Sequence, residues 1–102
     1  EINKIVVGGF SIDYDKRIVK VEEKEIHLTP IEYRIIVLLS KNVGKVLTHD
    51  YIMKEIWGPY INENQTLRVN MANIRRKIEA NPAEPKYIIT EVGVGYRMVD
   101  EV

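Results

Sequence analysis

The chain has 102 residues, and its 15 Lys and Arg side chains are balanced by 15 Asp and Glu side chains. A chain of this length buries enough surface to fold as one domain, residues 1–102, without a disulfide or metal to hold it together. It contains no Cys, which excludes disulfides and thiolate sites. Its longest apolar run, residues 35–39, is far shorter than the roughly 20 residues of a membrane-spanning helix, so we expect a cytoplasmic protein with no membrane partner.

The charge is distributed unevenly along this neutral chain. Residues 66–78 contain four basic side chains and no carboxylate. A basic segment on a neutral domain is a modest electrostatic signature of a nucleic-acid partner. The four cations are Arg68, Arg75, Arg76 and Lys77.

The first 28 residues favour strands rather than helices. Turn-forming residues separate short apolar or alternating runs that lack helical periodicity. We therefore expect an N-terminal antiparallel β-meander of three or four strands. The expected strands occupy residues 5–7, 10–12, 18–21 and 25–28.

A capping box marks the start of the first helix. Thr29 is suited to cap the helix, Pro30 to occupy its first position, and Glu32 to return a hydrogen bond to the cap. Apolar side chains then follow at the spacing of one buried helix face. These are Ile31, Ile35, Leu38 and Leu39.

A second, shorter helix is expected to begin at Thr48 and to run to Trp57. Gly58 and Pro59 end it, because glycine closes helices readily and proline cannot continue one. A turn-rich loop then leads to residue 64.

A third helix, over residues 65–80, has two contrasting faces. Its apolar stripe packs inward and consists of Leu67, Met71, Ile74 and Ile78. The opposite face has no acidic residue before Glu79, whereas an ordinary solvent face mixes Glu with Lys. At about 1.5 Å per residue the helix is roughly 24 Å long, enough to lie in a DNA major groove. The outward face and its flanks carry Thr66, Arg68, Val69, Asn70, Ala72, Asn73, Arg75, Arg76 and Lys77.

The chain ends with a predicted β-hairpin. Strands over residues 87–92 and 96–99 are joined by Gly93-Val94-Gly95, whose glycines allow the positive φ of a tight turn. Strands, three helices and a terminal hairpin in this order predict an α+β fold of the winged helix-turn-helix type.

The sequence offers no constellation for catalysis, so we expect no enzyme, no cofactor and no metal site. Ser11 and Ser40 lie outside any nucleophile-elbow pattern, and neither His27 nor His49 has a second ligand at metal spacing. Gly93-Val94-Gly95 lacks the third glycine of a dinucleotide loop.

Several side chains of the third helix suit the chemistry of DNA. Asn70 and Asn73 offer the paired donor and acceptor that match adenine, and the methyl groups of Val69 suit the methyl group of thymine. At the end of the second helix, the indole N–H of Trp57 is able to reach a phosphate oxygen while its ring packs inward. Each of these residues also has an ordinary structural interpretation as surface or core.

These residues fall in the order and spacing of a known family over essentially the whole chain. The sequence resembles the OmpR/PhoB-type winged-helix effector domain of bacterial two-component response regulators. Within that family, Trp57-Gly58-Pro59 and the stretch over residues 90–97 are similar to regulators of potassium-transport genes. The segments that carry the family resemblance are residues 28–33, 38–39, 44–48, 56–58, 66–69, 74–77 and 93–97.

The resemblance implies sequence-specific binding of double-stranded DNA and several partners. A phospho-receiver domain is expected upstream of Glu1, and a histidine kinase would act through it. Two copies are expected in tandem on repeated half-sites, because one footprint is too small for specificity within a genome. The loop of Pro59, Tyr60, Ile61, Asn62 and Glu63 would face RNA polymerase.

The resemblance and the helix pattern together assign residues to DNA. The residues expected to face bases are Arg68, Val69, Asn70 and Asn73. Those expected to contact phosphates are Thr48, His49, Trp57, Thr66, Arg75, Arg76, Lys77 and Tyr96. The wing, expected to enter the minor groove, comprises Val92, Gly93, Val94, Gly95 and Arg97.

Two positions depart from the family pattern. Many members carry Arg just before the wing glycines, and here Val92 follows Glu91, so that a minor-groove role of the wing depends on Arg97. Many members also carry Arg after the threonine that begins the second helix, and here the residue is His49. Its phosphate contact would strengthen on protonation.

A second hypothesis is a protein-interaction module without DNA binding. Its docking surface would be the tyrosine-bearing loop and the N-terminal strands. The acid-free face of the third helix favours DNA over this alternative.

Overall fold

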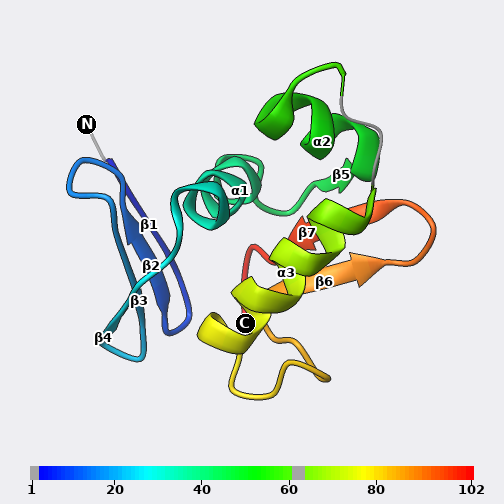
Figure 1. Cartoon of the computed structure of the whole chain (residues 1–102). Helices are drawn as coiled ribbons and strands as arrows, with labels where there is room; N and C mark the ends of the chain where they lie inside the picture. Colours follow the sequence, from blue (N-terminus) through cyan, green and yellow to red (C-terminus); the bar gives the residue numbers. More distant parts are fainter. Residues whose placement is uncertain (1–2, 61–63) are drawn as a thin grey trace.

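The computed structural model describes residues 3–60 and 64–102. An N-terminal sheet lies on one side of three helices, and a smaller C-terminal sheet lies on the other (Figure 1). The expected α+β winged helix-turn-helix fold is confirmed.

The N-terminal sheet is the predicted meander. Strands β1 (Lys4–Val7), β2 (Phe10–Asp13), β3 (Ile18–Val21) and β4 (Lys24–Ile26) pair in sequence order, each antiparallel to its neighbour. Alternation places one set of side chains inward, as expected of a sheet with one solvated face. The buried set comprises Val7, Phe10, Ile12 and Val19.

Helix α1 (Pro30–Lys41) begins with the predicted capping box. The backbone N–H of Glu32 donates to the Thr29 hydroxyl at 3.2 Å, and the N–H of Thr29 donates to Glu32 Oε1 at 3.0 Å. These bonds satisfy two of the free N–H groups at the helix start. The buried face of α1 is rotated by one position relative to the expected face. Ile36 is fully buried, whereas Leu38, which was expected to be buried, is only half-buried.

Helix α2 (His49–Trp57) also has the predicted bounds. The Thr48 hydroxyl accepts a hydrogen bond from the N–H of Tyr51 at 3.1 Å. Gly58 closes the helix with φ of 95°, a conformation that favours glycine.

Helix α3 (Asn64–Ile78) buries the predicted stripe of Leu67, Met71, Ile74 and Ile78. It ends two residues earlier than predicted. Beyond it, Glu79 turns inward, and its carboxylate accepts hydrogen bonds from the backbone N–H groups of the chain entering the last sheet. This side chain thus fixes how the chain leaves α3.

The C-terminal sheet has one strand more than predicted. Strand β5 (Val46–Thr48) pairs with β7 (Gly95–Met98), which also pairs with β6 (Ile88–Glu91), in the order β5-β7-β6. A three-residue strand before a helix cap is too short to produce a recognisable alternation in the sequence. The wing hairpin is therefore fastened to the chain segment that begins α2.

The two wing glycines serve different purposes. Gly93 adopts φ of 76°, as expected of the turn. Gly95 does not adopt a positive φ, and the expectation for it was wrong. A Cβ atom at Gly95 would lie 1.8 Å from the carbonyl oxygen of Leu47, so glycine is required there by the close approach of β5.

Candidate nucleic-acid interface

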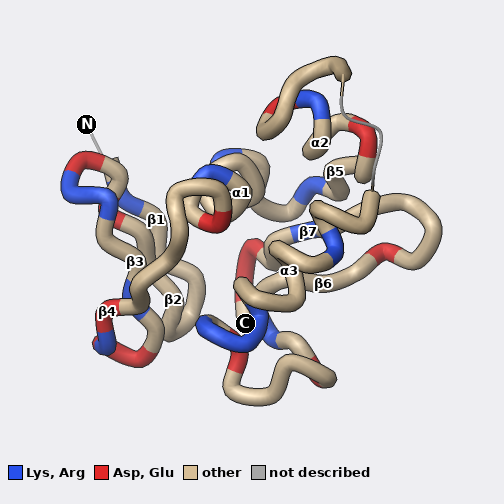
Figure 2. Tube along the Cα trace, viewed as in Figure 1, with Lys and Arg blue, Asp and Glu red and all other residues tan. Residues whose placement is uncertain are grey.

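Helix α3 presents the acid-free face predicted from its sequence. Its cations lie toward its two ends and no acidic residue interrupts it (Figure 2). Arg68 and Arg76 are exposed, Val69 is 48% exposed, and Thr66 is half-buried. The face expected to meet the bases therefore points outward, while the apolar stripe packs into the core.

The two asparagines of this face are held differently. Asn70 Nδ2 donates to the backbone carbonyl of Thr66 at 2.9 Å, which folds the amide onto its own helix. Asn73 Oδ1 instead accepts from Arg76 Nη1 at 2.6 Å, within the outward surface. Asn73 is thus oriented by a neighbouring cation of the same outward surface.

Arg75 is engaged within the protein. Its Nη2 atom donates to the carbonyl oxygen of Ile88 at 2.8 Å and to Thr90 Oγ1 at 2.7 Å. The guanidinium carbon also lies 5.5 Å from the centre of the Tyr96 ring, within cation–π range. Arg75 therefore ties α3 to the wing strands, a structural role that was not predicted for it.

The burial of Arg75 has an electrostatic consequence. Its Nε atom is buried and finds no hydrogen-bond partner among the described residues. Burial lowers the pKa of Arg75, while Tyr96 and Glu79 raise it in part. A guanidinium held in this way orients the helix that carries the proposed base contacts.

Lys77 forms an ion pair instead of extending from the surface. Its Nζ atom lies 2.6 Å from Oε1 of Glu32, whose side chain is only 3% exposed. Burial by itself raises the pKa of Glu32, but the hydrogen bond and charge of Lys77, together with the bonds from Thr29, bring that pKa below its usual value. The pair joins the start of α1 to the end of α3.

The predicted phosphate contacts at the start of α2 gather beside the wing. The His49 ring packs edge-on against the Tyr96 ring, with 5.3 Å between the centroids. The backbone N–H of His49 donates to the carbonyl of Val94 at 3.2 Å, and Thr48 caps the helix. Tyr96 is 5% exposed, so its ring is a packing element between His49 and Arg75.

The remaining predicted positions lie at the edges of this surface. Trp57 is half-buried at the end of α2 and packs against the core. In the following loop, Pro59 is exposed and Tyr60 is 94% exposed. The other three residues of the expected polymerase-facing loop lie outside the described residues. They are Ile61, Asn62 and Glu63.

The wing has an apolar tip and a paired arginine. Val92 is 90% exposed and Val94 is 48% exposed. Arg97 Nε lies 3.2 Å from Oε2 of Glu91, so the arginine expected to serve the minor groove is held by a neighbouring carboxylate.

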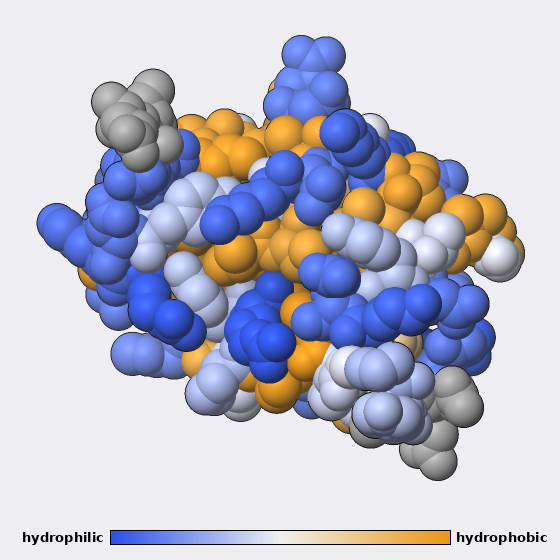
Figure 3. Space-filling model, turned by 90° about the horizontal axis from the view of Figure 1, so that it is seen from above, coloured by the Kyte–Doolittle hydropathy of each residue, from blue (hydrophilic) through white to orange (hydrophobic). Residues whose placement is uncertain are grey.

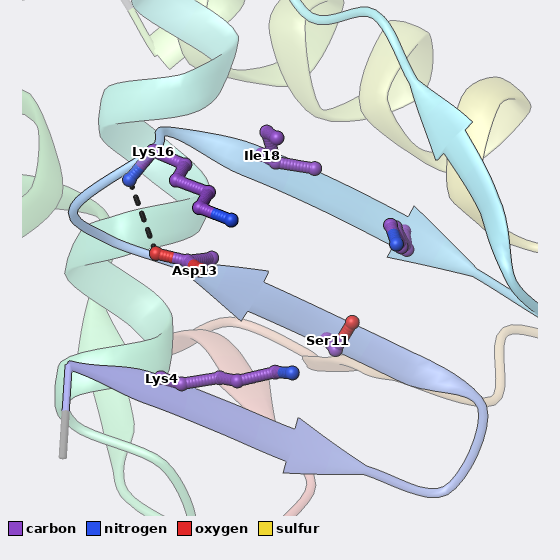
Figure 4. A pocket seen from close by; sticks show the side chains of 6 residues that line it. Lys4, Ser11, Asp13, Lys16 and Ile18 are labelled. Atoms are coloured by element: carbon purple, nitrogen blue, oxygen red, sulfur yellow. Dashed lines mark hydrogen bonds between the residues drawn. The ribbon is translucent and has the colours of Figure 1, made fainter.

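Two hollows lie away from this surface. One, about 140 Å³, lies over strands β1 to β3 and is lined in part by Lys4, Asp13 and Lys16; Asp13 Oδ1 accepts a hydrogen bond from the backbone N–H of Lys16 (Figure 4). The other, about 440 Å³, is an open groove between the β2–β3 turn, α1 and α2. Figure 3 shows the upper face, with apolar surface between hydrophilic side chains.

Within residues 3–60 and 64–102, no helix is long and apolar enough to cross a membrane. In the same ranges, no group of three His, Asp or Glu side chains is placed to hold a metal ion.

The fold agrees with comparisons to known proteins. A family model described as "Transcriptional regulatory protein, C terminal" matches residues 23–98. The chain belongs to this family.

Individual relatives refine the resemblance. The KDP operon transcriptional regulatory protein KdpE of Escherichia coli is 41% identical over 90 residues, which cover 87% of this chain and 40% of the relative. The resemblance to KdpE expected from the sequence is confirmed. The chain spans about 40% of the length of the curated relatives it matches.

Solved structures support the same assignment. DrrB, an OmpR/PhoB homologue from Thermotoga maritima, superimposes with a TM-score of 0.89 at 31% identity, over 95% of this chain and 44% of that chain. The DNA-binding domain of the response regulator AdeR, solved in complex with an intercistronic region, gives a TM-score of 0.77 at 26% identity, over 92% of this chain and 96% of that chain. The predicted OmpR/PhoB-type effector domain is thereby confirmed.

Proposed function

We propose that this chain binds double-stranded DNA in a sequence-specific manner, as the output domain of a two-component transcriptional response regulator. The observation that carries the proposal is the outward face of α3, which is free of acidic residues over residues 64–78 and rests on a fully buried stripe. A helix of this kind fits a major groove without placing a carboxylate against the phosphates.

The roles proposed for individual residues follow from how each is held. Asn73, braced by Arg76, and Val69 face the bases, with Arg68 and Asn70 beside them. The start of α2 supplies phosphate contacts through Thr48 and His49, where the positive end of a helix favours an anion. The other phosphate contacts proposed are Trp57, Thr66, Arg75, Arg76, Lys77 and Tyr96.

Arg75 and Lys77 differ from the other members of that phosphate set. Arg75 is hydrogen-bonded to β6, and Lys77 is paired with Glu32. Each contributes chiefly by fixing the position of α3 within the domain, and thereby the way in which α3 is presented to the duplex. To contact DNA directly, the guanidinium group of Arg75 or the ammonium group of Lys77 must bind a phosphate while it keeps its partner inside the protein.

The biological setting of the proposal comes from the relatives. The likeness to KdpE supports control of potassium-transport genes. A receiver domain and a cognate histidine kinase, RNA polymerase as a partner of the loop at Pro59 and Tyr60, and a tandem dimer on DNA belong to the same proposal. A domain that binds a bacterial chromosome acts in the cytoplasm, and the proposal assigns it no catalysis.

The dependence of affinity on salt tests this proposal. With about four to six phosphate contacts, the logarithm of the association constant falls by about 0.9 per phosphate for each tenfold increase in salt. Fluorescence anisotropy with a duplex selected from a random pool, and with its scrambled counterpart, measures both slope and specificity. A steep slope with tighter binding to the selected duplex is expected. A flat response, or equal binding to both duplexes, contradicts the proposal.

A further inference from the structure

The tip of the wing lacks the charge that minor-groove recognition usually uses. Residues 92–95 contain neither Lys nor Arg. Val92 and Val94 instead carry exposed methyl groups, at 90% and 48% exposure. Gly93 between them adopts φ of 76° at a point where a Cβ atom would meet no other atom within 4 Å. The tip is therefore a small, uncharged, projecting apolar loop.

Strand register places Arg97 away from this tip and away from α3. Arg97 lies opposite Ile89 on one side and Val46 on the other, within the body of the sheet. Thr90 and Tyr96 pair with each other, and both contact Arg75 of α3. Because successive side chains of a strand alternate between faces, Arg97 projects from the face opposite to α3.

The charge of Arg97 is also neutralised where it lies. Glu91 is on the same face as Arg97, opposite Gly95, and its carboxylate receives the Arg97 Nε–H at 3.2 Å. An arginine that entered the minor groove would have to give up this partner and leave Glu91 beside the phosphates. Such an exchange is unfavourable because it brings an unpaired carboxylate toward a polyanion.

Resting on the DNA-binding function proposed above, we infer that the wing meets the minor groove through the apolar side chains of Val92 and Val94 and does not select a narrow groove. Narrow A-tract grooves attract Arg and Lys by their enhanced negative potential. A tip without a cation gains nothing from that potential. The wing thus adds apolar contact with sugar edges, and sequence preference stays with α3.

Two duplexes that share the site for α3 and differ only under the wing test this inference. One carries an A-tract there and the other a mixed sequence. For the unaltered chain we expect affinities that agree within about twofold. In Val92→Arg we expect the A-tract duplex to bind at least about fivefold more tightly than the mixed one, with the salt slope steeper by about 0.9. Val92→Gln, a polar control without charge, should leave the ratio unchanged.

Arg97→Ala separates the two possible sources of a groove preference. If the inference holds, the ratio of affinities for the two duplexes is the same in Arg97→Ala as in the unaltered chain. An A-tract preference in the unaltered chain that disappears in Arg97→Ala would show that Arg97 enters the groove and would overturn the inference. A Val92→Arg variant with no altered ratio would also overturn it, because the tip would then lie outside the groove.

Failure of the inference is distinct from failure of the proposed function. If the unaltered chain binds neither duplex, the proposed function is wrong. If it binds both but prefers the A-tract, only the inference is wrong. Thermal unfolding of each variant verifies that the compared proteins are folded.

Discussion

Replacing Arg75 with alanine should destabilise the protein and weaken its binding to all DNA sequences alike. The substitution removes hydrogen bonds to the Ile88 carbonyl and to Thr90 Oγ1, at 2.8 and 2.7 Å, and a cation–π contact with Tyr96. Hydrogen bonds from a charged donor contribute about 1.5–3 kcal/mol each, and the cation–π contact about 0.5–1 kcal/mol. The free-energy cost of burying the guanidinium group must be subtracted from these contributions.

Burial of the arginine offsets part of this stabilisation. Its Nε atom is buried without a partner among the described residues, and such a group costs about 1–3 kcal/mol. The net loss of unfolding free energy expected for Arg75→Ala is therefore about 3 kcal/mol. Arg76→Ala, a matched change at an exposed position of the same helix, should lose less than about 0.5 kcal/mol.

Urea unfolding followed by the fluorescence of Trp57 and by circular dichroism measures both changes. The DNA assay should show a similar loss of affinity on selected and scrambled duplexes for Arg75→Ala, because Arg75 is assigned no contact with a base. An Arg75→Ala variant as stable as Arg76→Ala would refute the role of Arg75 as a link between α3 and β6. A loss of affinity for the selected duplex with no loss for the scrambled one would instead show that Arg75 reads a base.

Three further outcomes follow from other contacts. Because the pKa of Glu32 is lowered in the folded state, its ion pair with Lys77 stabilises the protein at pH values above the ordinary pKa of about 4.5, and that stabilisation is lost as pH falls through the lowered pKa. The difference in unfolding free energy between Glu32→Gln and the unaltered chain should therefore shrink as pH falls over that range. A difference that does not change with pH would contradict this. Gly95→Ala should lose about 3 kcal/mol of unfolding free energy in the urea assay, because the added Cβ atom collides with a backbone carbonyl of β5. Gly93→Ala, which is strained only by its positive φ, should lose about 1–2 kcal/mol in the same assay. Asn73→Ala should lose about 1–3 kcal/mol of binding free energy on the selected duplex and little on the scrambled one, and equal losses would remove its assigned role.

The sequence predicted the elements whose signals are local. The capping box at Thr29, the cap at Thr48 and the inward stripe of α3 are each encoded within a few adjacent turns. The structure confirms all three. Propensity and periodicity act on neighbouring residues, so they predict where a helix begins and which face it buries.

The missed features depend on residues far apart in the chain. Strand β5 exists because it pairs with β7, about fifty residues later, and that pairing is what requires glycine at Gly95. Likewise, the family resemblance and the position of Arg75 and Lys77 on the two flanks of the outward face predict phosphate contacts for both. Only the fold brings Ile88 to one and Glu32 to the other. No spacing rule within a single helix contains this information.

The most direct test of the central claim is to place a carboxylate on the outward face of α3 and measure the affinity for a single half-site. Val69→Glu adds one negative charge at the proposed centre of the interface. Val6→Glu makes the same change at a position that is 63% exposed on the N-terminal sheet. We expect Val69→Glu to weaken binding about a hundredfold, equivalent to roughly 2.7 kcal/mol, and Val6→Glu to change it by less than about twofold. Equal affinities for the two variants would contradict the claim that this face of α3 reads DNA.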